Sequence, residues 1–397
     1  MSSVKKVIHL IPGFFPISKG GAEYFALNLC KGLLRSGITP IIVTRGYGKL
    51  PNSDSINRIM VKRFKNVLPN FLKRYAVGLN LKSKFLRMIV AIFDVVGAVI
   101  LLIKIIRKYD IKVLHSSFIV PTGLIGVILK KLLKIKLIIT VHGPADFYTI
   151  PRILRKLLVS ILNRADSVIT VSRHLEMDIR KEIEIRNIST IMNGIERVDF
   201  SKYNDLKSIE EFNIDREINK PILISTGRLV KIKRTELLIK TLPIVRGRYP
   251  DLKTIILGEG IEREKLERLV NKFNLQETVI MPGWVSESTK RKFLAISDIF
   301  IHLSREEGLS LSLIESQLAG LPAIVPDRDF AGEIIIDNYN GVRIKEPINP
   351  KIIAEKIISL IKNEKKINKM KNRSKKVFEG FTLDKMVNNY IREYEKI

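Results

Sequence analysis

The feature that most constrains the fold is an alternation of short apolar runs with helical segments, found in both halves of the chain. Runs such as KKVIHLIP (5–12), TPIIVTRG (39–46) and DIFIHLS (298–304) have the length and β-branched content of buried strands. The segment 22–37 between the first two has apolar residues at helical spacing. Such alternation predicts an α/β fold, in which parallel sheets are covered by helices on both faces. Ligands then bind at the carboxyl ends of the strands.

The chain is too long for one ordinary core and predicts two domains. It has 397 residues, so each domain would hold roughly 200. We expect an N-terminal Rossmann-like domain over 1–198, a polar linker over 199–220 and a second α/β domain over 221–378. A final amphipathic helix follows at 379–397. Further strands are expected within 113–117, 136–143, 167–172, 221–226, 252–260, 279–285 and 322–326.

The positive charge is concentrated in the first half of the chain. Residues 1–200 hold 33 Lys and Arg against 12 Asp and Glu, whereas residues 201–397 hold 36 against 28. A net charge of +29 with this distribution indicates a domain that binds polyanions, either nucleic acid or an anionic membrane.

Residues 58–87 alternate basic and aromatic side chains and lead into the apolar run 88–106. A transmembrane helix of that length is conceivable. It would, however, separate the first two strands from their sheet partners across the bilayer. We therefore expect a core helix whose basic, aromatic lead-in lies on the membrane surface. A solvated basic helix without a function is the simpler alternative.

Cysteine usage and the N-terminus favour a cytoplasmic protein. The single cysteine, Cys30, excludes an internal disulfide and a cysteine-rich metal site, and it is expected to be a small core residue. The N-terminal residues run from two lysines directly into a strand-like segment and lack the apolar core of a signal peptide.

The segment SREEGLSLSLIESQLAGLP (304–322) carries the clearest chemical signal. It predicts a strand, a turn, a short helix and another strand, with Glu307 in the turn and Glu315 in the helix. A helix N-terminus binds phosphate, and the two carboxylates can accept hydrogen bonds from sugar hydroxyls beside it. Together these groups describe a nucleotide-sugar site. The structural alternative is that Ser312 and Glu315 form a capping box and that Glu307 is a first-turn acid.

Other loops in the chain have residues suited to the same ligand. Gly20 and Gly21 precede a helix, where a backbone can approach a phosphate closely. Their spacing is not that of a Rossmann dehydrogenase. Arg228 and Lys233 follow a strand and can bind phosphate oxygens. His142, with Asp146 nearby, follows another strand. The acidic pair at 327 and 329 resembles a metal-binding D-x-D sequence, but nothing nearby completes a metal shell.

These segments resemble the glycosyltransferases of family four (group one), which have the GT-B fold of two Rossmann-like domains facing each other across a cleft. The matching segments are P-x-x-x-G-G-A-E at 16–23, H-G-x-x-D at 142–146, G-R-L-x-x-x-K at 227–233 and the two glutamates with their neighbours. The resemblance implies that the C-terminal helix folds back onto the first domain. It places His142 beside the donor sugar, near the bond that breaks.

The resemblance also implies a donor-binding set. Glu307 would contact the donor sugar as a catalytic residue, and Glu315 would contact the ribose. The remaining expected donor-binding residues are Gly20, Gly21, Arg228, Lys233, Gly258, the backbone of Leu311, and Glu333. Two departures from the family pattern are Arg234 in place of a glycine and Asp329-Phe330 in place of two glycines.

The implied activity is a retaining, metal-independent sugar transfer from a nucleotide diphosphate sugar, which is a co-substrate, with no other cofactor. We expect a glycan or lipid-linked acceptor, an anionic membrane surface as partner, no nucleic acid, and a position at the inner face of the cell membrane. The alternatives are a nucleic-acid-binding protein, a same-fold epimerase or phosphorylase, and a catalytically inactive family member that docks at membranes.

Overall fold

The computed structural model describes residues 4–65, 84–148, 155–203, 212 and 221–397. The chain divides into two compact units. Unit 1 comprises Met1–Gly194 and Leu383–Ile397, and unit 2 comprises Ile195–Thr382. Of the linker expected at 199–220, residues 204–211 and 213–220 lie outside the described residues. Its first residues form a short helical turn, η3 (Phe200–Tyr203).

Unit 1 contains an eight-stranded sheet in the order β3-β4-β2-β1-β5-β6-β7-β8. All neighbouring strands are parallel except β3 and β4, which are antiparallel. The strands are β1 (Lys6–Leu10), β2 (Thr39–Arg45), β3 (Ser53–Ile56), β4 (Ile59–Phe64), β5 (Val113–Ser117), β6 (Lys136–Val141), β7 (Ser167–Thr170) and β8 (Ile188–Thr190).

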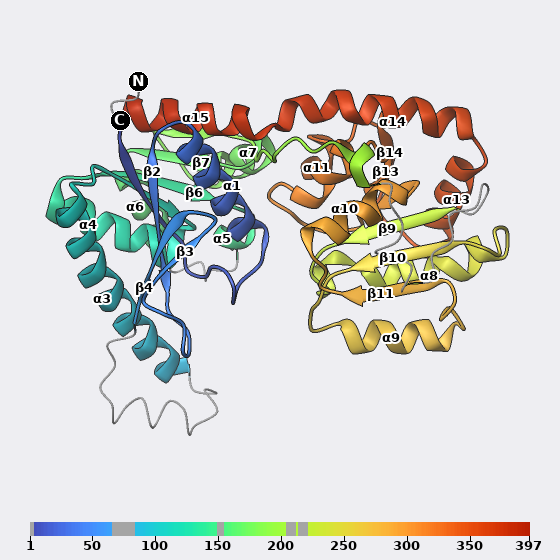
Figure 1. Ribbon diagram of the computed structural model, residues 1–397, viewed down its shortest axis with the longest axis horizontal. Helices are drawn as coiled ribbons and strands as arrows, with labels where there is room; N and C mark the ends of the chain where they lie inside the picture. The colour runs from blue at the N-terminus through green and yellow to red at the C-terminus, as the bar shows by residue number, and fades with distance from the viewer. Residues whose placement is uncertain (1–3, 66–83, 149–154, 204–211, 213–220) are drawn as a thin grey trace. The chain divides into compact units, whose positions relative to one another are not determined.

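Helices cover both faces of this sheet (Figure 1). They are α1 (Gly21–Arg35), α3 (Lys84–Tyr109), α4 (Leu124–Leu133), α5 (Ala145–Tyr148), α6 (Arg155–Arg164), α7 (Arg173–Glu182) and α15 (Leu383–Lys396), with a short irregular turn, η1 (Ile119–Gly123). The C-terminal helix α15 packs against α1, and its Tyr390 and Tyr394 are buried in the same core as Cys30. Cys30 is therefore the core residue that its position predicts.

One expectation about the basic segment is wrong. Residues 59–64 form β4, a strand of the sheet, and are not part of an amphipathic lead-in to the long helix. The side chains along β4 alternate between buried and half-buried, and Arg63 is buried with its guanidinium donating to the carbonyls of Pro51 and Phe15. Residues 66–83 of the expected lead-in lie outside the described residues.

The apolar run 88–106 lies in one continuous helix, α3. Ala98, Leu102 and Ile106 are buried, whereas Ile92, Val96 and Ile100 are exposed. None of the helices in the described ranges is both long enough and apolar enough to be a membrane-span candidate.

Unit 2 has a six-stranded, wholly parallel sheet in the order β11-β10-β9-β12-β13-β14. The strands are β9 (Ile222–Thr226), β10 (Lys253–Leu257), β11 (Val279–Gly283), β12 (Ile299–Ile301), β13 (Ala323–Pro326) and β14 (Gly341–Ile344). Both units are therefore α/β with mainly parallel sheets, and the expected fold class is confirmed.

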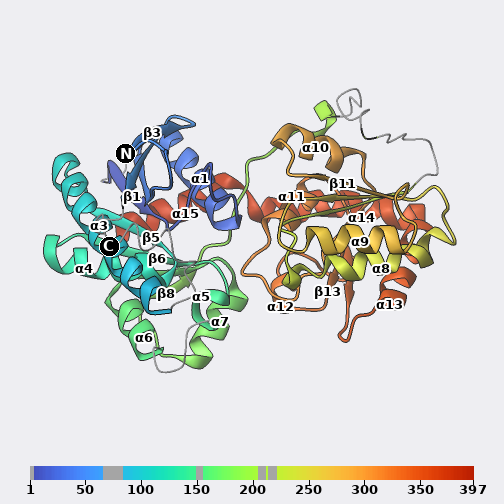
Figure 2. The same ribbon diagram turned by 90° about the horizontal axis from the view of Figure 1, so that it is seen from below.

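The helices of unit 2 also lie on both faces of their sheet (Figures 1 and 2). They are α8 (Thr235–Arg246), α9 (Arg263–Lys272), α10 (Glu287–Ile296), α11 (Leu311–Leu318), α12 (Asp329–Gly332), α13 (Pro350–Ile361) and α14 (Glu364–Phe378), with the short turns η5 (Lys231–Lys233) and η6 (Glu379–Phe381). Because every strand is parallel, the loops that follow β9, β10, β11, β12 and β13 emerge at one edge of the sheet.

Candidate functional site

The loop between β12 and α11 forms the centre of the candidate site in unit 2. Leu311 is the first residue of α11, so its backbone N–H has no acceptor within the helix. The helix is capped by Ser310, whose hydroxyl accepts a hydrogen bond from the Leu313 N–H. The capping-box alternative for Ser312 and Glu315 is therefore wrong. Glu307 precedes the helix by four residues and is not a first-turn acid.

Glu307 is held by two nitrogen-bearing side chains. Lys233 Nζ donates to Glu307 Oε1, and His302 Nε2 lies 3.5 Å from the same oxygen. Burial opposes ionisation of this carboxyl, but Lys233 and His302 outweigh it and hold the pKa of Glu307 well below its usual range. Glu307 is thus a carboxylate, and none of the described residues donates a hydrogen bond to its second oxygen, Oε2, which can accept one from a hydroxyl group.

Glu315 has a lysine partner of its own. Lys290 Nζ lies 2.7 Å from Glu315 Oε1 and 3.1 Å from Glu287 Oε2. Burial raises the pKa of Glu315, and the Lys290 ammonium acts against that shift. Each motif glutamate is therefore paired with a lysine from a different loop or helix. Neither Lys290 nor His302 was identified from the sequence, because only the fold brings them to the two glutamates.

The loop after β9 presents two further cations. Arg228 is exposed, and its guanidinium has no ion-pair partner in the part of the chain that the structure describes. Arg234 has a backbone φ of 53°, the left-handed conformation that glycine adopts most easily. This explains why a glycine is usual there. The arginine is held in that conformation while Nη1 donates to Glu346 Oε1 at 2.6 Å.

Gly258 has a packing reason to be glycine. Its φ is +134°, and a Cβ at this position would lie 1.9 Å from the carbonyl oxygen of Gly227. The loops after β9 and β10 can therefore approach each other only because residue 258 has no side chain. Its assignment to donor binding stays a prediction.

The departure at Asp329 and Phe330 is accommodated inside unit 2. Asp329 begins the short helix α12, and Phe330 is buried with its ring edge-on to His302, 6.3 Å between centroids. The Phe330 side chain therefore fills the core behind His302. Glu333 is half-buried and follows α12 directly.

In unit 1, the two glycines of the first loop lie at the start of α1. Gly20 is the N-cap, and its N–H donates to Glu23 Oε2 at 2.9 Å, while Ser18 Oγ donates to Glu23 Oε1. A Cβ at Gly20 would lie 2.7 Å from Glu23 Oε2, but one at Gly21 would meet no described atom within 4 Å. Packing within the described residues therefore gives no reason for a glycine at position 21, and the assignment of both glycines to donor binding stays a prediction.

His142 follows β6 and is held from several sides. Its ring lies 4.8 Å from the Phe25 ring and 5.0 Å from the Phe118 ring, and Nε2 lies 2.9 Å from Ser117 Oγ. The backbone N–H of His142 donates to Asp146 Oδ2 at 2.7 Å. Burial raises the pKa of Asp146 to about 7 despite this hydrogen bond. Burial lowers the pKa of His142 to about 3, so the imidazole is neutral.

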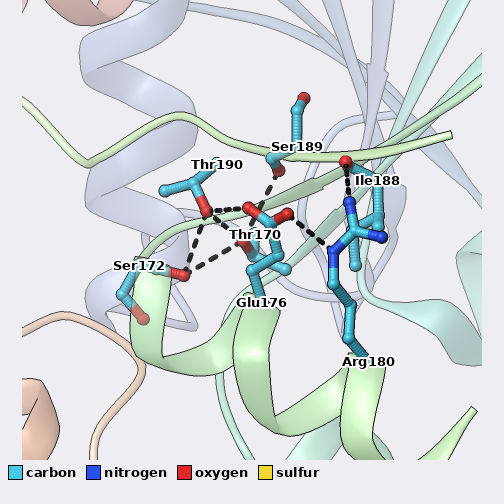
Figure 3. Close-up of polar contacts among 7 residues, drawn as sticks. All are labelled: Thr170, Ser172, Glu176, Arg180, Ile188, Ser189 and Thr190. Atoms are coloured by element: carbon cyan, nitrogen blue, oxygen red, sulfur yellow. Dashed lines mark hydrogen bonds and ion pairs between the residues drawn. The ribbon is translucent and has the colours of Figure 1, made fainter.

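A polar network fixes the loop after β7 in the same unit (Figure 3). Thr170 Oγ1 donates to the Ser172 carbonyl, and Thr190 donates to Glu176 Oε2 at 2.6 Å. Glu176 also accepts from Arg180, which donates in turn to the Ile188 carbonyl. These groups satisfy one another, so the network ties α7 to β7 and β8 and places its N-cap, Ser172, at the edge of the sheet.

The structure therefore groups the expected residues by unit. Arg228, Lys233, Gly258, the Glu307–Glu315 segment and Glu333 follow the strands of unit 2 at one edge of its sheet, and Lys233 contacts Glu307 directly. Gly20, Gly21 and His142 lie at the corresponding edge in unit 1. Across the described ranges, no three His, Cys, Asp or Glu side chains are grouped as a metal would require, and Asp327 is paired with Arg343.

Comparison with known families matches nearly the whole chain. Residues 19–197 match Glycosyltransferase Family 4, and residues 207–377 match Glycosyl transferases group 1. An uncharacterised glycosyltransferase of Methanocaldococcus jannaschii is 28% identical over 420 residues, covering 100% of both chains. The GPI3 subunit of phosphatidylinositol N-acetylglucosaminyltransferase from Saccharomyces cerevisiae is 25% identical over 336 residues, which cover 81% of this chain and 70% of the relative.

Solved structures agree on the fold. A glycosyltransferase from Rickettsia africae superposes with a TM-score of 0.75 at 21% identity, covering 99% of this chain and 98% of the other. HepE of Anabaena, in complex with UDP-glucose, superposes with a TM-score of 0.77 at 16% identity, covering 99% of this chain and 100% of the other.

Proposed function

The chain belongs to the glycosyltransferases of group 1 and family 4, which have the GT-B fold, and we propose that it transfers a sugar from a nucleotide diphosphate sugar to a glycan or lipid-linked acceptor at an anionic membrane surface. The transfer retains the configuration of the anomeric carbon and needs neither a metal ion nor a further cofactor. The enzyme works in the cytoplasm, at the inner face of the cell membrane.

The observation that carries the proposal is the pairing of two glutamates with two lysines beside the N-terminus of α11. A lone anion-binding helix end would suit many ligands. Carboxylates beside it repel phosphate but accept hydrogen bonds from hydroxyl groups. A nucleotide diphosphate sugar satisfies both requirements, because its diphosphate lies between two groups that carry hydroxyls, the ribose and the donor sugar. HepE, a protein of the same fold, binds UDP-glucose.

The chemistry follows from the charges of unit 2. Arg228, Lys233 and the first N–H groups of α11 can take up the negative charge that develops on the departing diphosphate. Glu307 stays ionised, so Oε2 can orient a donor-sugar hydroxyl while Lys233 balances its charge. Cations and helix dipoles that are already in position before the reaction stabilise the leaving group without any rearrangement of the protein during the reaction.

The helix α3 supports a membrane-bound acceptor. Ile92, Val96 and Ile100 are 56%, 42% and 45% exposed and recur every four residues, which puts them on one face of the helix. The exposed residue Lys104 continues this stripe, and Arg107 and Lys108 follow in the last turn. An apolar stripe ending in cations suits an interface with anionic lipid. The name of the yeast relative, a phosphatidylinositol N-acetylglucosaminyltransferase subunit, supports a lipid acceptor.

The transfer is tested with radiolabelled nucleotide sugars and a membrane extract. We expect label from one donor to enter a lipid or glycan product with the wild-type chain and with Arg248→Ala, and not with Arg228→Ala. Arg248 is a matched control because it is also exposed but lies between α8 and the start of β10, at the opposite edge of the sheet. Epimerisation of the donor without an acceptor, or a requirement for inorganic phosphate, would contradict the proposal.

Membrane binding is tested by flotation with vesicles of anionic and of neutral lipid. We expect the wild-type chain to float with the anionic vesicles and the Val96→Glu/Ile100→Glu variant to stay in solution. The control, Ile261→Glu, changes an equally apolar residue of unit 2 that is 88% exposed, and it should float like the wild type. Equal flotation of all three proteins would show that α3 is not part of the membrane-binding surface.

A further inference from the structure

The imidazole of His142 shares a serine hydroxyl with a second histidine. Ser117 ends β5, is fully buried, and its Oγ lies 2.9 Å from His142 Nε2 and 2.9 Å from His9 Nε2. A hydroxyl has one proton to donate. It also has two lone pairs, so both histidines could donate to Oγ, but the hydroxyl proton would then have no acceptor among the described residues. In the arrangement that satisfies all three groups, one histidine accepts that proton and the other donates its own to Oγ.

All the histidines of this cluster are neutral. Burial lowers the pKa of His9 to about 3, as it does for His142, and it holds the pKa of His115 well below the ordinary value. His115 does not compete for Ser117. Its Nδ1 lies 2.8 Å from the Tyr394 hydroxyl and its Nε2 lies 2.7 Å from Thr140 Oγ1.

The direction of the two hydrogen bonds is decided by the far nitrogen of His9. His9 is 1% exposed, and its Nδ1 has no hydrogen-bond partner among the described residues. If Nδ1 carried the proton, a buried N–H would be left without an acceptor, and such orphaned donors are rarer in proteins than orphaned acceptors. His9 therefore carries its proton on Nε2 and donates it to Ser117 Oγ.

We propose that Ser117 is a positioning residue that sets the tautomer of His142. With Oγ accepting from His9, the hydroxyl proton of Ser117 is donated to His142 Nε2. His142 must then carry its own proton on Nδ1. That nitrogen makes no hydrogen bond to the described residues, and the His142 side chain is half-buried. His9, Ser117 and the rings of Phe25 and Phe118 thus present His142 as an Nδ1–H donor in one fixed orientation.

The ligand of this donor is an oxygen acceptor. Resting on the function proposed above, the acceptor is a hydroxyl or phosphate oxygen of the nucleotide sugar. A neutral N–H donor can stabilise charge on such an oxygen without itself adding a proton to it. The tautomer assignment does not depend on that function, because it follows from the hydrogen bonds within unit 1 alone.

The test is a long-range ¹H–¹⁵N correlation spectrum of the full chain labelled at histidine, with His9 and His142 assigned from His9→Phe and His142→Phe variants. We expect an unprotonated Nε2 and a protonated Nδ1 for His142, and the reverse for His9. A protonated Nε2 of His142 in the wild-type spectrum would overturn the proposal, whatever the enzyme's activity.

Two serine variants separate positioning from packing. Ser117→Ala removes the shared hydroxyl, and we expect His142 Nε2 to become partly protonated. Ser116→Ala removes the neighbouring buried hydroxyl of the same strand, which donates to the Thr122 carbonyl and to no histidine, and it should leave both tautomers unchanged. In the transfer assay, kcat should fall about tenfold for Ser117→Ala, which corresponds to the free energy of one hydrogen bond. For Ser116→Ala, kcat should fall less than twofold. An unchanged His142 tautomer in Ser117→Ala would also refute the proposal.

Discussion

The contact between Lys233 and Glu307 makes a prediction about stability as well as activity. Replacing Lys233 by Met keeps the aliphatic stem and removes the ammonium group. Glu307 is then left as a carboxylate, 18% exposed, whose remaining close partner among the described residues is the neutral ring of His302. Exposed pairs contribute less than about 1 kcal/mol, and breaking a buried pair costs about 3–5 kcal/mol. For this half-buried pair we expect a loss of about 2 kcal/mol in the free energy of unfolding.

The assay is urea unfolding followed by the fluorescence of Trp284, the chain's single tryptophan, which lies in unit 2. Lys233→Met should lower the midpoint, whereas Lys233→Met/Glu307→Gln should recover most of the loss because no unpaired charge remains. Arg228→Met is the matched control and should leave the midpoint unchanged. If Lys233→Met were as stable as the wild type, or the double variant less stable than Lys233→Met, the ion pair would not stabilise unit 2 by neutralising Glu307.

The same pair gives a pH dependence with a defined sign. The pKa of Glu307 is lower in the folded chain than its ordinary value, so the unfolded state binds the proton first as the pH falls. The stabilisation is complete above the ordinary glutamate pKa and is lost below it, toward the depressed value. The midpoint of the wild type should therefore fall more steeply than that of Lys233→Met between about pH 5 and pH 3.

Three further changes are expected to act elsewhere in the chain. Burial raises the pKa of Asp146 to about 7, so between about pH 4 and pH 7 the folded state keeps a proton that the unfolded state has lost, and stability should fall as the pH rises through this range. Thermal unfolding of Asp146→Asn should lack this dependence, and at pH 8 the variant should be more stable than the wild type by up to about 4 kcal/mol. Gly32→Ala places a Cβ 2.2 Å from Val387 Cγ2 and should cost about 1–3 kcal/mol by calorimetry, part of which Val387→Ala restores. Both Arg234→Gly and Arg234→Val lose the hydrogen bond to Glu346, so any difference in stability between them measures the strain of a left-handed backbone at a β-branched residue. We expect Arg234→Val to be less stable than Arg234→Gly by about 1–2 kcal/mol in urea unfolding, and equal stabilities would contradict this explanation.

Some strands were predictable from the sequence and others were not. The runs that became β1, β2 and β9 are mostly apolar, because a strand covered by helices on both faces has no polar side. The strands β3, β4, β8 and β14 escaped prediction. β3 and β8 are short and only partly buried, and the lysine and arginine of β4 resemble the basic residues that follow it.

The site shows the same division. The spacing of Glu307 and Glu315 is a local pattern, and the expectation that both lie beside a helix N-terminus could be made without coordinates. Their partners could not be found in this way. Lys290 reaches Glu315 from α10, and His302, with Phe330 edge-on to its ring, reaches Glu307 from the end of β12. A local pattern contains no information about which distant cation compensates a buried charge.

The sequence by itself determined the alternation of elements, the family and the positions of the polar loops, because apolar periodicity and short motifs depend on neighbours along the chain. The tertiary structure decided which charges are neutralised, why residue 258 must be glycine, and how His9 and Ser117 orient His142. Those properties depend on burial and on contacts between strands far apart in the sequence, which exist only once the sheets have formed.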